Sequence, residues 1–255
     1  MRSAIAVLGL LASTSLASAA DFGGPSYDGS LKDGPVLAQQ SWSGLYVGAN
    51  VGYGWADLDS TPIFDPQLPE EGVRGDFEPD GWLGGGQIGY NFQSGQVVFG
   101  VEADYQWADL NDSASASFNV KNPLDITTSV DVQSFGTVRG RIGLSLNRVL
   151  PYLTAGFAWA DVKGQTRLSY GPGPEANWKG GDSAVHTGWV VGGGVEVALD
   201  PRWSAKAEYL YFDLGEKSYT TTFVNGAGEV GDTYKNDADL TMHTFRVGVN
   251  YRFGH

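Results

Sequence analysis

Three histidines and one serine are the residues of this chain best suited to nucleophilic or metal chemistry. His186 and His243 fall near the expected ends of long connecting segments, where a metal or haem would be accessible, and His255 is the last residue. None of the three stands in an H-E-x-x-H or comparable motif. Ser183 is the one candidate nucleophile, but a serine needs a base held beside it, and the sequence supplies only nearby His186. We therefore predict no catalytic site, no metal site and no cofactor.

Composition removes further classes of function. The chain has 255 residues and no cysteine, which excludes disulfides, zinc-thiolate sites and iron–sulfur clusters. Its formal net charge of −13 and pI of about 4.5 argue against a nucleic-acid partner, because phosphate binding needs a basic face. The hydrophobic content of 42% is too high for a disordered chain.

The other residues that could form a site are charged. They lie on the polar face of segments in which apolar and polar residues alternate. Five are basic and five acidic, and this equality favours ion pairing over a site of one sign. The basic residues are Arg139, Arg141, Lys206, Arg246 and Arg252; the acidic residues are Glu102, Asp104, Glu196, Glu208 and, nearer a loop, Asp131.

Eight such segments must position these charges. Each has a two-residue period, which is typical of a strand with two different faces; they cover 45–55, 82–92, 97–107, 130–144, 152–159, 189–199, 203–211 and 244–253. In the fourth segment this period places Val130 and Val132 with Val138 on the apolar face, opposite Arg139. Beyond Ala20 no apolar run approaches the roughly 20 residues of a membrane helix.

The connections between these segments alternate in length. Short turns fall at 93–96, 146–149 and 200–202, whereas long segments cover 56–81, 109–128, 162–183 and 214–239. Short turns at one end and long loops at the other are typical of transmembrane β-barrels with an even strand number. A soluble sandwich or lipocalin-like barrel would have a polar outer face and no such segregation. The sequence thus predicts an all-β, eight-stranded antiparallel up-and-down transmembrane barrel whose polar face is inside.

Aromatic residues on the apolar face gather near the strand ends rather than the strand centres. Rings prefer the two membrane–water interfaces, so this placement predicts two girdles. The predicted girdle residues are Trp55, Trp82, Trp107, Trp159, Trp189 and Tyr211 at the loop end, with Trp203, Tyr251 and Phe253 at the turn end.

An eight-stranded barrel has an interior only just wide enough for side chains. Enclosed charges are costly unless paired, so we predict an ion-pair network that plugs the lumen. The alternative, a narrow porin or ligand-uptake channel, stays open, although a conducting pore favours a wide lumen or a ring of one sign.

The long segments carry most of the negative charge, with 18 acidic and 7 basic residues. The first, 56–81, holds eight carboxylates and only Arg74. Such density could gather divalent cations, but the spacing matches no EF-hand-like loop. We interpret these residues as solvated loop charge that faces possible ligands or host surfaces.

The N-terminal sequence predicts that the protein is exported from the cytoplasm. Arg2, the apolar run from Ala4 to Ala12 and the small residues up to Ala20 form a secretory signal peptide, cleaved after Ala19 or one residue later. We therefore divide the chain into a signal peptide (1–19), a flexible periplasmic leader rich in Gly and Pro (20–42) and the barrel domain (43–255).

Three stretches carry a family resemblance: 44–55 (GLYVGANVGYGW), 85–92 (GGQIGYNF) and 246–253 (RVGVNYRF). They resemble small alphaproteobacterial outer-membrane proteins of the OmpA-like β-barrel superfamily, which include outer-membrane immunogenic and porin-family proteins. The resemblance implies an eight-stranded barrel among outer-membrane lipid and lipopolysaccharide, with a periplasmic N-terminus and extracellular loops. It also implies assembly by the barrel-assembly machinery, which reads a C-terminal aromatic residue, here Phe253, although this chain continues with Gly254 and His255.

The resemblance does not fix one activity. Members of the superfamily stabilise the envelope as surface antigens, and some bind haemin, but no haemin-ligand motif is present to carry over. We expect an envelope protein with a structural and surface-interaction role.

Overall fold

The computed structural model describes residues 40–60, 76–118, 124–169, 177–225, 227 and 230–253. The predicted signal peptide (1–19), the leader as far as residue 39 and the Gly254–His255 tail lie outside this part of the chain. Among the described residues, no helix has the length and apolar character needed to cross a membrane.

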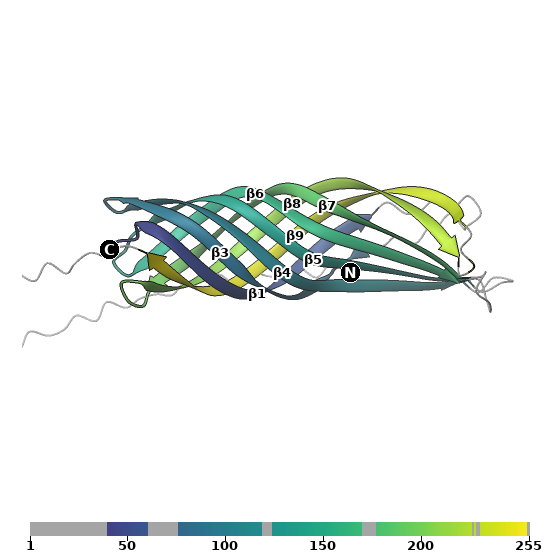
Figure 1. Ribbon diagram of the computed structural model, residues 1–255, viewed down its shortest axis with the longest axis horizontal. Helices are drawn as coiled ribbons and strands as arrows, with labels where there is room; N and C mark the ends of the chain where they lie inside the picture. The colour runs from purple at the N-terminus through teal and green to yellow at the C-terminus, as the bar shows by residue number, and fades with distance from the viewer. Residues whose placement is uncertain are drawn as a thin grey trace, which may run out of the picture. The chain divides into compact units, whose positions relative to one another are not determined.

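In the described part of the chain, eight long strands form a closed antiparallel ring, because β1 pairs with both β3 and β9 (Figure 1). Neighbours in the chain are neighbours in the ring, so the barrel is of the up-and-down type. The predicted fold class is confirmed. The bounds are β1 Gly44–Ser60, β3 Asp80–Ser94, β4 Val97–Phe118, β5 Leu124–Leu144, β6 Val149–Ser169, β7 Asn177–Ala198, β8 Trp203–Asn225 and β9 Val230–Phe253, with the two-residue β2 Asp76–Phe77 paired to β1.

The three predicted turns join β3 to β4, β5 to β6 and β7 to β8, all at one end of the barrel, here named the turn end. Gly95 and Asn147 have φ angles of 61° and 62°, a left-handed conformation that Gly and Asn adopt most readily. In the third turn, the backbone N–H groups of Trp203 and Arg202 donate to the Asp200 carboxylate at 2.8 and 2.7 Å. These hydrogen bonds hold the pKa of Asp200 below its usual value.

At the opposite end, named the loop end, the strands extend much further than the sequence analysis predicts. β4 continues to Phe118, β6 to Ser169 and β8 to Asn225, so most of the described residues in the predicted long segments are strand. The strand ends predicted at the start of these long segments were therefore wrong. Alternation continues in these extensions, but the apolar residues now face inward, as Leu110, Val162 and Leu214 do.

The predicted face of Val130 and Val132 was also wrong. Both side chains are buried inside the barrel, with 5% and 1% exposed, whereas Val138 faces outward with 52% exposed. The cause is a β-bulge: on β5 the register advances two residues, from Val132 to Ser134, while β6 advances one. Asp131, between two inward valines, therefore does not join the interior charges.

Candidate functional site

The outward face of the turn-end half of the barrel is an apolar band with aromatic residues at its margins. Trp82, Trp107, Trp189 and Trp203 have 72, 67, 48 and 44% of their surface exposed. Neighbouring rings contact one another, as in the T-shaped Trp203–Tyr251 pair with centroids 5.1 Å apart. The other predicted girdle residues lie on the same outward face: Trp55, Trp159, Tyr211, Tyr251 and Phe253.

The lumen of the same half is filled by ion pairs centred on Arg139. This guanidinium contacts Glu102 at 2.6 Å, Asp104 at 3.0 Å and Glu208 at 3.0 Å, so it joins β5 to β4 and to β8 across the barrel. All four side chains are at least 97% buried. A cation enclosed in this way needs its carboxylates, because an unpaired buried charge is very costly.

Three further cations extend the network around the ring. Arg141 contacts Glu196 at 2.7 Å, Lys206 contacts Glu102 at 3.1 Å and Arg246 contacts Asp104 at 3.0 Å. Two tyrosines inside the barrel donate to the same carboxylates: Tyr46 to Glu102 at 2.7 Å and Tyr152 to Glu208 at 3.0 Å. The structure thus brings eight of the nine predicted network residues together.

Amide side chains and inward glycines complete this layer. Gln87 of β3 accepts from Asn50 at 2.7 Å and donates to Asn250 at 2.8 Å, which ties β3 to β1 and β9. A Cβ atom at Gly194 would lie only 2.7 Å from the Tyr152 hydroxyl. Glycine at this inward position therefore makes room for the tyrosine that crosses the lumen.

Arg252, the ninth predicted member, differs from the prediction. Among the described residues it has no carboxylate within ion-pair distance; its guanidinium lies 4.8 Å from the centre of the Trp42 ring and donates to the Ser41 carbonyl. Trp42 is fully buried and packs with Val98, Leu150 and Ala198. The last residues of the predicted leader therefore close the turn end of the lumen. A tryptophan just before the first strand is the sequence signal that was missed.

A large apolar cluster fills the lumen toward the loop end, which the sequence analysis also missed. Phe135 and Phe212 pack edge to face with centroids 5.5 Å apart, and the Arg246 guanidinium lies 5.4 Å from the Phe135 ring centre. Arg246 therefore joins the ion pairs to this cluster. The cluster contains Ala56, Leu58, Leu83, Leu110, Val130, Val132, Phe135, Ala158, Ala160, Val162, Val190, Leu210, Phe212, Leu214, Ala238, Leu240 and Met242.

The residues considered for nucleophilic or metal chemistry lie on different sides of the wall. His186 is buried inside the barrel, with its Nδ1 atom 3.4 Å from the Gly215 carbonyl, whereas Ser183 is exposed outside. His243 lies outside, stacked on Trp55 and 2.7 Å from the Tyr209 hydroxyl. In the described part of the chain, no three His, Asp or Glu side chains are grouped to hold a metal ion. Residues 61–75 of the acidic first segment lie outside it.

Comparison with known families now identifies the barrel. The family model described as outer membrane protein beta-barrel domain matches residues 4–253. The chain belongs to this family. An outer-membrane barrel has an apolar outer face, so the outward apolar band of this ring is its membrane-spanning surface.

Two relatives of this outer-membrane barrel are bacterial outer-membrane immunogenic proteins. The 25 kDa outer-membrane immunogenic protein of Brucella melitensis is 32% identical over 220 residues, which cover 86% of this chain and 82% of the relative. The 31 kDa outer-membrane immunogenic protein of that organism is 35% identical and covers 84% of each chain. The crystal structure of the outer membrane protease OmpT from Escherichia coli matches with a TM-score of 0.50 and 8% identity over 82% of this chain and 97% of that chain, which shows the fold alone. This chain is an outer-membrane β-barrel envelope protein.

Proposed function

We propose that this envelope protein is a closed, non-conducting barrel that stiffens the outer membrane and presents its loop end to the surroundings of the cell. One observation carries the proposal: three successive layers of side chains fill the described lumen. These layers are the Trp42 cluster at the turn end, the ion pairs around Arg139, and the apolar cluster around Phe212. Its role is structural and interactive rather than catalytic.

The proposed orientation places the turn end and the N-terminus in the periplasm and the loop end outside the cell. It is supported by the short turns at one end and the long strand extensions at the other, which is the usual asymmetry of outer-membrane barrels. Outward-facing polar residues of the extensions, such as Asp109 and Lys163, would then meet lipopolysaccharide, ligands or host surfaces. Assembly would use the barrel-assembly machinery, with Phe253 as the terminal aromatic residue.

Planar-bilayer recording of the purified, refolded barrel tests the closed lumen. We expect no stable openings from the wild-type barrel, with an inserted porin as the positive control. A variant without residues 62–78 tests whether that segment, rather than the lumen side chains, blocks conductance. We expect this variant to show no openings, as in the wild-type barrel. Discrete openings in either protein would contradict a lumen closed by its own side chains and would favour the narrow-channel alternative.

A further inference from the structure

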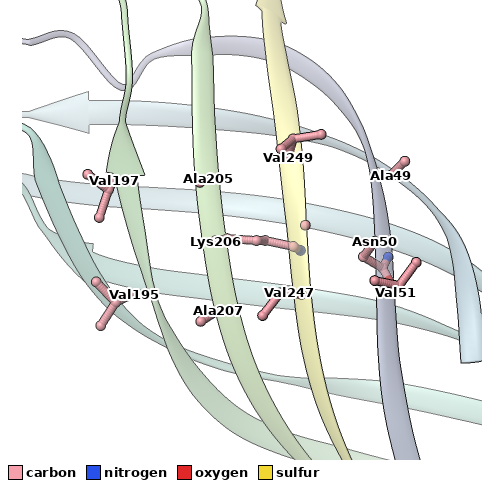
Figure 2. Close-up of a pocket in the computed structure, with 11 residues that line it drawn as sticks. Ala49, Asn50, Val51, Val195, Val197, Ala205, Lys206, Ala207, Val247 and Val249 are labelled. Atoms are coloured by element: carbon pink, nitrogen blue, oxygen red, sulfur yellow. The ribbon is translucent and has the colours of Figure 1, made fainter. Parts of the chain in front are cut away.

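The lipid-facing wall has a hollow on one side, over β7, β8, β9 and β1 (Figure 2). Its volume is about 650 Å³, and its walls are made of small aliphatic side chains, among them Ala49, Ala205, Ala207 and Val249. Lys206 also borders it, but its ammonium group is bound to Glu102 inside the barrel. The surface that the hollow offers to the membrane is therefore hydrocarbon.

The hollow arises from the order of side chains along the β8–β9 pair. Four successive outward pairs are Trp203–Tyr251, Ala205–Val249, Ala207–Val247 and Tyr209–Phe245. Two pairs of small residues thus lie between two pairs of large rings. The rings stand out from the wall at both ends, and the alanines leave a depression between them.

The size and surroundings of this hollow indicate which kind of molecule binds in it. A volume of about 650 Å³ falls in the range of small-ligand sites, about 300–1,000 Å³. The hollow lies within the band that faces outer-membrane lipid, so hydrocarbon chains are the molecules at hand. An acyl chain matches its apolar walls.

A cation stands at the turn-end margin of the hollow. Arg202 is exposed, and its Nη1 atom lies 3.5 Å from the hydroxyl of Tyr251, the outward ring next along β9 from Val249, which lines the hollow. Within the described residues, no carboxylate lies within ion-pair distance of this guanidinium. The neighbouring Asp200 accepts hydrogen bonds from the backbone instead. A guanidinium at the level of an interfacial Trp–Tyr pair is complementary to a lipid phosphate.

The geometry points to a specific lipid site: the hollow holds one acyl chain of an anionic phospholipid, and Arg202 binds its phosphate. The lipid belongs to the leaflet at the turn end, because Trp203 and Tyr251 mark that interface. The site goes beyond the proposed function and does not depend on a closed lumen, so a conducting barrel would leave it unaffected.

Native mass spectrometry of the barrel in detergent micelles tests the site, with dioleoyl phosphatidylglycerol and dioleoyl phosphatidylcholine as probes. The wild-type barrel should retain one phosphatidylglycerol in preference to phosphatidylcholine. Ala207→Leu fills the hollow with an apolar side chain and should weaken retention of either lipid about tenfold. Arg202→Gln removes the charge and should reduce the preference for phosphatidylglycerol about fivefold.

Matched variants control both effects. Ala103 is an outward alanine of similar exposure on β4, the strand opposite β8 in the ring, and Arg148 is exposed in another turn. Ala103→Leu and Arg148→Gln should both bind lipid as the wild type does. Equal retention by Ala207→Leu and Ala103→Leu would overturn the acyl-chain site, and an unchanged preference in Arg202→Gln would overturn the phosphate contact.

The native chain has no cysteine, so single-cysteine variants test for the rival occupant, a second copy of the barrel. Under mild oxidation in phosphatidylglycerol vesicles, Ala207→Cys should stay monomeric, as should Ala103→Cys. A disulfide-linked dimer formed by Ala207→Cys alone would assign the hollow to a second copy and overturn the lipid assignment.

Discussion

Arg139 and Leu240 both point into the lumen, and each has only 1% of its surface exposed, yet their surroundings are opposite. Arg139 lies among three carboxylates in the turn-end half of the barrel. Leu240 lies among aliphatic and aromatic side chains in the loop-end half. The outward faces are reversed as well. Val138 lies on the outer face of the turn-end half, whereas Asp57 and Asp109 lie on the outer face of the loop-end half.

We interpret this reversal as a response of the inner face to the medium outside the wall. In the membrane half, lipid requires an apolar outer face, and the two-residue period leaves the inner face for polar groups. Those groups must then pair with one another. Beyond the loop-end girdle the outer face carries exposed charges such as Asp57 and Asp109, as a surface in water does. An apolar interior there gains the ordinary hydrophobic stabilisation of a barrel in water. One continuous sheet therefore uses two different means of stabilisation.

Arg139→Ala should have the largest effect on the membrane half. The change leaves Glu102, Asp104 and Glu208 around an empty site, and breaking a buried ion pair in this way costs about 4 kcal/mol. The free energy of unfolding should fall by about that amount, measured by urea titration of the barrel in detergent with circular dichroism. The unfolding temperature should fall with it.

Arg167→Ala is the control for Arg139→Ala. Arg167 is an exposed arginine of the loop-end half, and its replacement should change the free energy of unfolding by less than about 0.5 kcal/mol. If Arg139→Ala unfolds at the same urea concentration as the wild type, the ion pairs do not hold the membrane half together.

Phe212→Ala should weaken the loop-end half by about 3 kcal/mol, because it leaves a cavity beside Phe135 in the apolar cluster. Hydrogen exchange followed by mass spectrometry should show faster exchange in the strand extensions and unchanged exchange in the turn-end half. Phe157→Ala is the matched control, since that ring is 51% exposed on the lipid-facing wall. Equally faster exchange in both halves would show that the barrel is stabilised as one unit.

The period of two residues was enough to predict the strands and the inward charges of the membrane half. Glu102 and Glu208 each lie between two apolar neighbours, and Arg139 follows Val138, so strict alternation assigns their face without any knowledge of the partner strands. Pairing across the lumen follows from the narrow interior of eight strands. The network could therefore be predicted to the level of individual residues, apart from Arg252, whose partner Trp42 precedes the first strand.

The loop-end half could not be predicted in the same way. The bulge near Gln133 adds one residue to β5. If a fixed two-residue period is continued past the bulge, every side chain of β5 beyond it is assigned to the wrong face. The extensions of β4 and β8 are polar on their outer face, which lowers their mean hydropathy and makes them resemble loops. Their inward residues, such as Leu110 and Leu214, indicate a strand only once it is known that the inner face is apolar in this half of the barrel.

Val138→Lys tests the reversal on the outer face and should have the smallest effect of the three substitutions. Val138 lies in the middle of the lipid-facing band, where a lysine costs about 2 kcal/mol. The measurement is the free energy of unfolding from phosphatidylcholine bilayers, with urea as denaturant and tryptophan fluorescence as the signal.

Val185→Lys is the closest match for Val138→Lys, because the two valines have 51% and 52% of their surface exposed. Val185 lies in the loop-end half, four residues beyond Trp189 on β7, and pairs across the sheet with Asp161. A lysine there meets water and a carboxylate, so the free energy of unfolding should stay within about 0.5 kcal/mol of the wild-type value. If the two lysines cost the same, the outer medium does not change at the loop-end girdle. The apolar filling of the loop-end half would then need another cause.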